Sequence, residues 1–289
     1  MKVLVTGHMG FIGAHLARSF ERAGHEVCGL DVADGDMDAR DYFRHNHERF
    51  DAVIHAAAVV GGRRVIEWTP LNHAQNLEID AALFAWAERT KVGRVVYFSS
   101  SCAYPVALGR IASRRLHEHD IDLTRPAWPD ELYGWTKLTG ELVAQTAQAA
   151  GVPVSVVRPF SVYGPGMREG FAVRGFLEQV QKRADPIQIW GDAGQVRDFI
   201  HVSDVCKAVL MIAGMGIDGP VNLGTGRATS LHELAAMMGK AAGYSPGIKV
   251  DSSMPAGVPR LVADPGRLHE FYTPGVTLED YLAEVLTHG

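Results

Sequence analysis

The chain has 289 residues, 47% of them hydrophobic, and a formal net charge of −5. This is sufficient for one large domain or a domain with a smaller lobe, and the acidic balance argues against a nucleic-acid partner. No apolar run reaches the roughly 18 residues of a membrane span, and the first strand begins too early for a signal peptide. The three cysteines, Cys28, Cys102 and Cys206, show no metal or disulfide spacing. We expect a cytoplasmic protein with no membrane partner and no metal.

The first stretch of the chain predicts a dinucleotide site. An apolar strand at residues 3–5 and an amphipathic helix from residue 12 are joined by a turn containing Gly7, Gly10 and Gly13. The first glycine allows a sharp turn, the second lets backbone N–H groups approach a pyrophosphate, and the third lets the helix pack on the strand. A second strand ends at Asp31, whose carboxylate suits the adenosine ribose of NAD.

Strands and helices alternate through the first half of the chain. Further strands are expected at 50–58, 94–101 and 153–159, with one helix ending near residue 49 and others at 70–90 and 132–150. This alternation predicts an α/β fold with a Rossmann-like, doubly wound parallel sheet. The carboxyl ends of its strands carry Asp31, Ala57, Ser100 and Arg158-Pro159, so these residues are expected to converge.

The second half of the chain is less regular. It predicts strands at 187–190 and 221–224, helices at 202–215 and 231–242, and dense proline and glycine from 245 to 274. We predict a dinucleotide-binding domain at 1–159, to which 198–224 returns. A smaller C-terminal substrate-binding lobe would comprise 160–197 and 225–289.

Tyr133 and Lys137 are four residues apart on a predicted helix and therefore share one face. A nearby ammonium and a positive nicotinamide ring would favour the phenolate, which could take a proton from an alcohol while the cofactor takes a hydride. Ser100 could hold the same alcohol oxygen. A Tyr-x-x-x-Lys pair taken alone also fits a solvated helix face.

Together with these residues, several motifs make the chain similar to extended short-chain dehydrogenases/reductases of the nucleotide-sugar epimerase/dehydratase type. The motifs are Thr6–Gly13, His55–Ala57, Ser99–Ser101, Tyr133–Lys137, Arg158–Gly166, Arg197–Asp204 and Asn222–Gly226. The resemblance implies that Tyr133 is the redox base, Lys137 its partner and a cofactor ligand, and Ser100 the third catalytic residue. Cofactor contacts are expected at Gly7, Met9, Gly10, Phe11, Ile12, Gly13, Asp31, Asp36, Met37, Ala56, Ala57, Ala58, Tyr133, Lys137 and Pro159.

The same resemblance assigns the substrate side. Arg197 and Arg260 match the family's diphosphate arginines, and Ser101 is a further expected substrate contact. The pairs Arg63-Arg64 and Arg114-Arg115 are interpreted as solvated loop charges. The expected ligand is a nucleotide-diphosphate sugar.

Cys102 stands where the family's 4,6-dehydratases have an acid, so dehydration is not expected. The stretch from Ser100 to Pro105 resembles the branch of GDP-mannose 3,5-epimerase and GDP-fucose synthase, in which this cysteine is an acid/base residue. A thiolate with a pKa near 8.5 would suit that role. A small buried apolar residue is the alternative interpretation of Cys102.

The chain departs from that branch at two places. Gly166 stands where the fucose synthase has a histidine that acts as the partner acid. Arg168 is the only cation nearby in the sequence, and an arginine is a poor proton donor because it stays charged. Met9 replaces the arginine of the NADP-using glycine loop, and Asp31 would repel a 2′-phosphate. We therefore expect bound NAD, recycled in each turnover.

The predicted function is that of a cytoplasmic NAD-dependent isomerase, an epimerase of a nucleotide-activated sugar acting through a transient 4-keto intermediate. One alternative is an NADPH-dependent 4-keto reductase/epimerase of the GDP-fucose synthase type. Another, of a different class, is a dinucleotide-sensing regulatory protein, which the Tyr133/Lys137 pair contradicts. Family relatives often pair through two helices, so a homodimer is expected.

Overall fold

The computed structural model describes residues 1–35 and 37–287, and its largest feature is a parallel sheet of six strands in the order β10-β5-β4-β3-β1-β2. The strands are β1 (Lys2–Thr6), β2 (Glu26–Leu30), β3 (Ala52–His55), β4 (Val95–Phe98), β5 (Val154–Pro159) and β10 (Gly219–Leu223). The order reverses direction between β1 and β3, as in doubly wound sheets. The predicted Rossmann-like α/β fold is confirmed.

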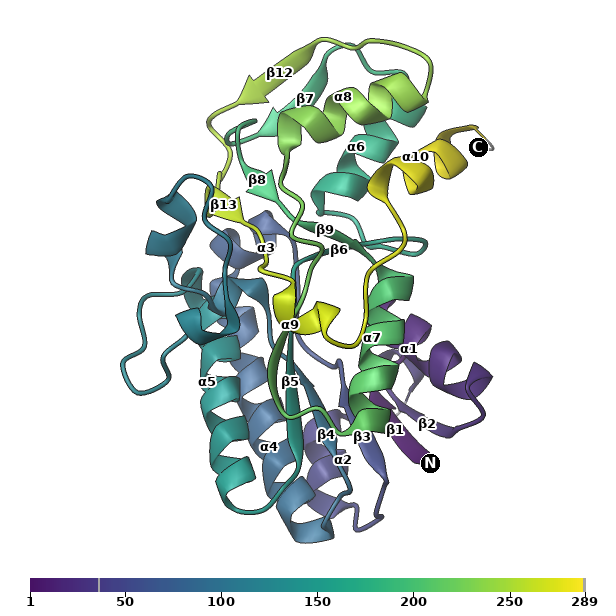
Figure 1. The fold of residues 1–289 in the computed structure, drawn as a ribbon, viewed down its shortest axis with the longest axis vertical. Coiled ribbons are helices and arrows are strands. Elements are labelled where there is room, and N and C mark those ends of the chain that lie inside the picture. The colour runs from purple at the N-terminus through teal and green to yellow at the C-terminus, as the bar shows by residue number, and fades with distance from the viewer. Residues whose placement is uncertain (36, 288–289) are drawn as a thin grey trace.

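Helices cover both faces of this sheet (Figure 1). Helices α1 (Phe11–Arg22) and α7 (Val202–Met215) pack on one face, and α2 (Ala39–His45), α4 (Gln75–Thr90) and α5 (Glu131–Ala149) on the other. The strands are Val-rich and are buried on both faces, which is the pattern expected of a parallel sheet between two helical layers. The carboxyl ends of the strands point toward the smaller part of the molecule.

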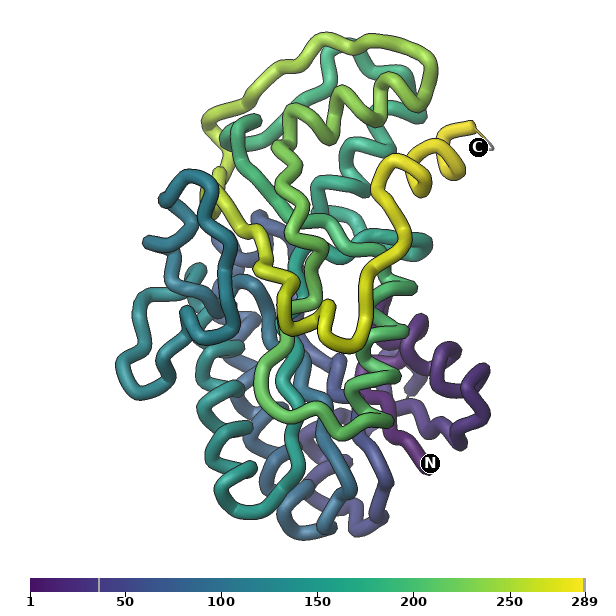
Figure 2. The backbone as a smooth tube through the Cα atoms, viewed as in Figure 1, coloured from purple at the N-terminus to yellow at the C-terminus, as the bar shows by residue number. Residues whose placement is uncertain are grey.

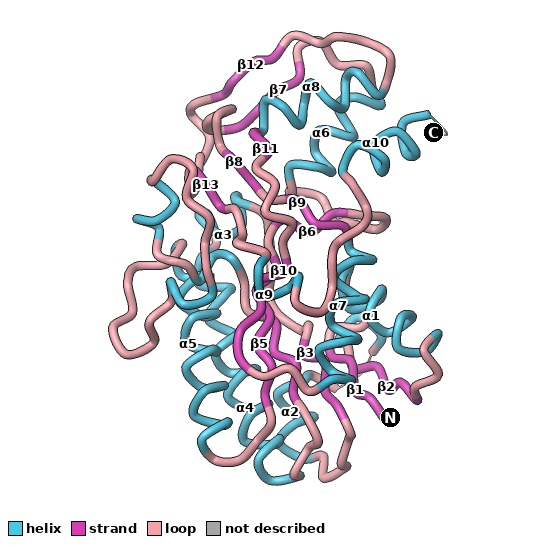
Figure 3. The backbone as a smooth tube through the Cα atoms, in the orientation of Figure 1, coloured by secondary structure: helices cyan, strands magenta, loops and turns pink. Residues whose placement is uncertain are grey.

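The smaller part lies beyond those carboxyl ends and is built from short sheets and helices (Figure 3). One sheet pairs β7 (Ile187–Trp190) with β12 (Ile248–Asp251), another orders β11 (Thr229–Ser230), β8 (Val196–Arg197) and β13 (Arg260–Leu261), and β6 (Ser161–Tyr163) pairs with β9 (Phe199–His201). Helices α6 (Ala172–Gln181), α8 (Leu231–Ala241) and α10 (Leu278–Thr287) enclose a separate hydrophobic core.

The chain passes between the two parts several times, as the tube in Figure 2 shows. The segment after β5 enters the smaller part at β6, and α7 and β10 return to the large sheet. Residues far apart in sequence therefore meet at the boundary between the two parts.

The local differences from the predicted elements are small. The predicted helix at 70–90 is divided into a 3-10 turn, η2 (Pro70–Ala74), and α4. Helix α2 ends at His45, earlier than the predicted residue 49, and residues 63–68 form a short helix, α3 (Arg63–Trp68), where a loop was expected. The other short elements are the 3-10 turns η1 (Val32–Asp34), η3 (Ser101–Ala103), η4 (Val106–Arg110) and η5 (Glu118–Asp120) and the short helix α9 (Gly266–His269).

Within residues 1–35 and 37–287, no helix combines the length and the apolar character needed to cross a bilayer.

Candidate active site

The glycine turn has the close packing that its sequence predicts. Gly7 has a positive φ of 74°, and a Cβ there would lie 2.8 Å from the backbone of Ala57. A Cβ on Gly13 would lie 2.0 Å from the Gly7 carbonyl oxygen, so only glycine lets α1 approach β1 this closely. Gly10 is the N-cap residue of α1, and the first N–H groups of that helix face the turn.

Asp31 lies beside this turn. Its Oδ2 accepts a hydrogen bond from the Met9 backbone nitrogen at 3.1 Å, and its Oδ1 accepts one from Ala33 at 2.9 Å. The carboxylate is thereby held at the edge of the turn, and its negative charge would disfavour a 2′-phosphate on the adenosine ribose. The glycine turn and the Asp31 carboxylate together fit a dinucleotide whose adenosine ribose is unphosphorylated.

The other expected cofactor contacts surround the same strand ends. Ala57 donates to the Thr6 hydroxyl at 3.3 Å, Ala56 donates to the Thr6 carbonyl at 3.2 Å, and Ala58 follows in the loop after β3. Phe11 and Ile12 begin α1, Pro159 ends β5, and Met37 is exposed. Asp36 lies outside the described residues.

The segment with Ser100 and Cys102 packs against the first turn of α5. The Cys102 carbonyl accepts a hydrogen bond from the Asp130 backbone at 3.0 Å, and a Cβ on Gly134 would lie only 2.4 Å from the same oxygen. Ser100 caps η3 by accepting from the Cys102 nitrogen at 3.1 Å. This packing brings Ser100 and Cys102 beside Tyr133, and the buried Ser101 lies in the same turn.

Tyr133 is buried, and the protein around it favours its neutral form. Burial raises the pKa of Tyr133 above that of an ordinary tyrosine, and the neighbouring Cys102 adds to this increase. A hydrogen bond with Ser100 acts in the opposite direction. The protein groups by themselves therefore do not supply the lowered pKa that the sequence suggested.

Lys137 is buried below the same site. Its Nζ donates to the Phe98 carbonyl at 2.9 Å and lies 5.2 Å from the centre of the Tyr97 ring. Burial lowers the pKa of Lys137, and the charges of Asp80 and Glu141 oppose that decrease. Lys137 is thus placed on the Tyr133 face of α5, as its spacing predicted.

The surroundings of Cys102 do not favour ionisation of its thiol. Burial raises the pKa of Cys102 to about 12, and the charge of Asp130 adds to the increase, while Ser100, Arg63 and Arg197 act against it. The thiol is therefore neutral at physiological pH, because too little positive charge offsets its desolvation.

The charges of Arg63 and Arg197 act on Cys102, whereas the sequence had indicated Arg168 as the nearby cation. Arg63 was interpreted as a solvated loop charge, but it begins α3 and forms a two-point ion pair with Asp130, at 3.0 and 2.5 Å. Arg197 is partly buried, its charge also acts on Cys102, and the charge of Arg63 acts on it in turn. Arg168, in contrast, lies near the glycine turn, with its Nη2 3.9 Å from the position of a Cβ on Gly10.

Arg197 and Arg260 lie on neighbouring strands of the β11-β8-β13 sheet, where Arg197 pairs with Leu261 and Arg260 with Val196. Arg197 donates to the Val196 carbonyl at 2.9 Å and to the Gln195 side chain at 2.7 Å, and Arg260 donates to the Arg114 carbonyl at 2.9 Å. Burial lowers the pKa of Arg197 to about 10, and the charge of Arg63 adds to the decrease. An anion at Arg197 would relieve this repulsion.

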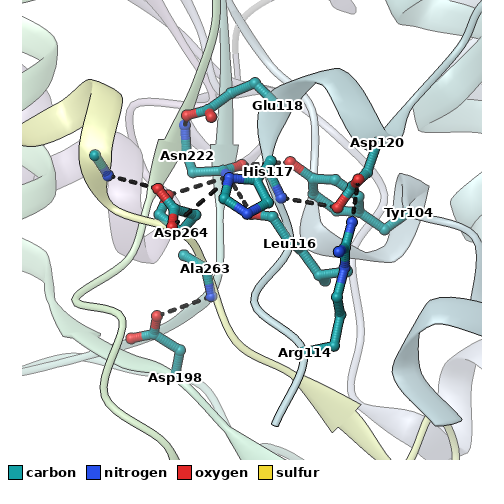
Figure 4. A network of polar contacts seen from close by, with 11 residues as sticks. Tyr104, Arg114, Leu116, His117, Glu118, Asp120, Asp198, Asn222, Ala263 and Asp264 are labelled. Carbon is teal, nitrogen blue, oxygen red and sulfur yellow. Dashed lines mark hydrogen bonds and ion pairs between the residues drawn. The ribbon is translucent and has the colours of Figure 1, made fainter. Parts of the chain in front are cut away.

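A buried carboxylate, Asp198, organises the backbone next to these arginines. It accepts hydrogen bonds from the backbone of Thr225, Gly226 and Ala263, at 2.8, 2.8 and 3.1 Å. Figure 4 shows Asp198 with Ala263, and nearby Asn222, which accepts from the Tyr104 hydroxyl at 2.6 Å and donates to the Leu116 carbonyl at 2.8 Å. These contacts hold β10 and β13 together and explain two of the sequence motifs.

Sequence reasoning missed three residues next to the site. Asp130 pairs with Arg63, and Asp80 lies close enough to influence both Lys137 and Tyr133. His73 lies with its ring 5.0 Å from that of Tyr133, and its Nδ1 is 3.0 Å from the Val59 carbonyl, to which it must donate. The spacing of these residues along the chain contains no indication of their proximity.

The comparisons with known proteins agree with this geometry. The family model described as "NAD dependent epimerase/dehydratase family" matches residues 3–224, which include the glycine turn, Ser100 and the Tyr133/Lys137 pair. The chain belongs to this family. The resemblance stated from its motifs is confirmed.

Relatives in the epimerase/dehydratase family differ in their reactions. The chain is 31% identical to a dTDP-4-dehydro-6-deoxy-D-allose reductase of Streptomyces sp, over 93% of this chain and 89% of the relative. It is 27% identical to the GDP-L-fucose synthase of Escherichia coli (strain K12), over 93% and 90%. The members of this family that the chain resembles thus include a reductase and a synthase.

Solved structures give the same fold with a bound cofactor. The UDP-glucose 4-epimerase of Thermus thermophilus in complex with NAD has a TM-score of 0.83 and 25% identity, over 100% of this chain and 98% of the epimerase. MoeE5 in complex with UDP-glucose and NAD has a TM-score of 0.82 and 29% identity, over 99% and 98%. The chain is therefore an enzyme of the nucleotide-sugar epimerase/dehydratase/reductase family.

Proposed function

We propose that the protein is an NAD-dependent epimerase of a nucleotide-diphosphate sugar, acting by reversible oxidation at carbon 4. The observation that supports this most directly is the cluster of Ser100, Tyr133 and Lys137 at the carboxyl ends of the strands that hold the glycine turn. This cluster is suited to moving a proton on and off a sugar hydroxyl beside a dinucleotide.

The glycine turn and Asp31 would hold NAD, which supplies a hydride acceptor when it is bound. Tyr133 would take the proton of the 4-hydroxyl and later return it, and Ser100 would hold the same oxygen. The positive charges of Lys137 and of the bound cofactor would offset the burial that raises the pKa of Tyr133. The sugar would leave the active site with one inverted centre and no net change in oxidation state.

Arg197 and Arg260 would bind the diphosphate, with Ser101 contacting the sugar, because guanidinium groups fit phosphate oxygens. Arg197 is partly buried, and its guanidinium donates to two neutral oxygens, which favours an anionic ligand there. In this proposal the segments 160–197 and 225–289 form the nucleotide-sugar lobe, and residues 1–159 with 198–224 form the dinucleotide domain.

We also propose a homodimer in the cytoplasm. Helices α4 and α5 lie side by side on one face of the sheet, and they expose Leu77 (39%) and Leu142 (46%), which a second copy could cover (Figure 1). The three cysteines are all free, as a reducing compartment favours.

A reductase/epimerase that consumes NADPH is the second candidate, and the reductase and fucose synthase among the relatives favour it. In such an enzyme Tyr133 would donate a proton to the 4-keto oxygen as the hydride of bound NADPH reduces the carbonyl, and Cys102 would stay a neutral thiol. The negative charge of Asp31 favours NAD over NADPH and therefore argues against this candidate.

The test is to identify the nucleotide that co-purifies with the protein and then to incubate the enzyme with a panel of nucleotide sugars in D2O. An epimerase retains NAD, needs no added cofactor and yields an isomer. Tyr133→Phe should lower turnover by about 10²- to 10⁴-fold. Stoichiometric consumption of NADPH would favour the reductase, and unchanged turnover in Tyr133→Phe would refute both candidates.

A further inference from the structure

A carboxylate buried in α4 lies at the centre of a polar network under the candidate active site. Asp80 is 2% exposed, and its Oδ1 lies 3.3 Å from the His55 Nε2. Its Oδ2 accepts a hydrogen bond from the Tyr97 hydroxyl at 2.6 Å. A carboxylate in such a place is unfavourable unless it has hydrogen bonds and a nearby positive charge.

The surroundings of Asp80 favour its ionised form: burial by itself would raise the pKa of this carboxyl, but the charge of Lys137 and the hydrogen bonds of His55 and Tyr97 lower it overall. Burial lowers the pKa of His55, which favours the neutral ring. In the neutral tautomer with the hydrogen on Nε2, that nitrogen donates to Asp80, and Nδ1 accepts from the Thr6 hydroxyl at 2.9 Å.

The cation whose charge acts on this network is Lys137. The Tyr97 ring lies 5.2 Å from the Lys137 Nζ, while the Tyr97 hydroxyl is bonded to Asp80. Tyr97 therefore lies between the carboxylate and the lysine and contacts both, while the charge of Asp80 itself acts on Lys137.

The other carboxylate near Lys137 is already paired. Glu141 receives two hydrogen bonds from the Arg158 guanidinium, at 2.9 and 2.6 Å. Asp80 is within ion-pair distance of His55 alone among the described residues. The titratable groups around Lys137 are Asp80 on α4, Glu141 and Tyr133 on α5, His55 on β3 and Tyr97 on β4.

We propose that Asp80 is a positioning residue of the Tyr133/Lys137 pair, whose charge, held by His55 and Tyr97, keeps Lys137 an ammonium aimed at the active site. This rests on the proposed function, because it presumes that a charged Lys137 is needed for the proton transfer by Tyr133. The charge of Asp80 acts against the burial that lowers the pKa of Lys137. Its removal should therefore let Lys137 lose its proton at a lower pH.

The test is a titration of Lys137 in the full-length protein. The chain has seven lysines, so the ¹³Cε resonance of Lys137 in lysine-labelled enzyme can be assigned by its loss in Lys137→Met. Asp80→Asn should lower the titration midpoint by at least about one pH unit, a tenfold change. Asp80→Ser is a second neutral variant, to be used if the asparagine protein does not fold.

Tyr97→Phe is the matched control, because it removes a hydrogen bond from the network and leaves the Asp80 charge. Its midpoint should move by less than a third of the shift in Asp80→Asn. A midpoint that is unchanged in both neutral variants, or that moves equally in Tyr97→Phe, overturns the proposal.

The pH profile of turnover separates this proposal from the proposed function. The alkaline limb of kcat should move to lower pH in Asp80→Asn, in parallel with the Lys137 midpoint, with KM for the nucleotide sugar unchanged. If the midpoint moves while Tyr133→Phe leaves turnover unaffected, the proposed function fails and the charge coupling stands. If Tyr133→Phe abolishes turnover and the midpoint does not move, only the role of Asp80 fails.

Discussion

Arg63 and Asp130, 67 positions apart in the chain, form a two-point ion pair beside the Cys102 thiol. Arg63 begins α3, and Asp130 immediately precedes α5. Their opposite charges influence the same sulfur, since the arginine lowers the pKa of Cys102 and the aspartate raises it.

The pair therefore predicts opposite effects on the reactivity of Cys102. Asp130→Asn should speed alkylation of Cys102 by iodoacetamide at pH 9 by at least about threefold, which is half a pKa unit, and Arg63→Gln should slow it. The measurement is the rate of modification of the Cys102 peptide by mass spectrometry. Glu67→Gln is the control, because Glu67 also contacts Arg63, at 3.3 Å, but is not among the charges that shift Cys102. Rates that change in the same direction in both variants would contradict this account.

Cofactor preference should depend on Asp31. Asp31→Ser removes the negative charge at the edge of the glycine turn, so the ratio of the Kd for NADP to that for NAD should fall by at least about tenfold, or about 1.4 kcal/mol. Calorimetric titration of both dinucleotides measures this ratio. Asp34→Ser serves as the control, because Asp34 contacts His8 at 3.5 Å and not the turn backbone. An unchanged ratio in Asp31→Ser would mean that other residues select the cofactor.

Two helical glycines predict opposite changes in stability. A Cβ on Gly140 of α5 would lie 1.9 Å from the Tyr97 hydroxyl oxygen and 2.7 Å from the Asp80 Oδ2, whereas one on Gly175 of α6 would meet nothing within 4 Å. Gly140→Ala should lower the free energy of unfolding by about 1–3 kcal/mol through overpacking. Gly175→Ala should be neutral or raise it by up to about 1 kcal/mol. Urea unfolding measures both, and a neutral Gly140→Ala would show that the packing around Tyr97 is loose.

The stability of the protein should fall as the pH falls from 7 to 5, in part because of His55. Burial lowers the pKa of His55, so below about 6.5 the unfolded chain binds a proton that the folded chain does not. This contributes a slope of up to about 1.4 kcal/mol per pH unit, with stability increasing with pH. Unfolding curves of His55→Gln should lack this part of the slope, while His47→Gln, at an exposed position, should retain it. Parallel curves for wild type and His55→Gln would contradict the prediction.

The sequence alone determined the fold and the family of this protein. The glycines of the turn, Asp31 at the end of β2, and Tyr133 four residues before Lys137 are local patterns, because turns, strand ends and helix faces are set by neighbouring residues. The alternation of strands and helices then places these patterns on one edge of the sheet.

Only the tertiary structure decided the electrostatics of the site. The neutral state of Cys102, the Arg63–Asp130 pair and the charge of Asp80 near Lys137 depend on how deeply each group is buried and on which groups pack against it. Segments far apart in the chain supply those neighbours, and desolvation acts through three-dimensional packing. No spacing along the chain therefore predicts which charges meet.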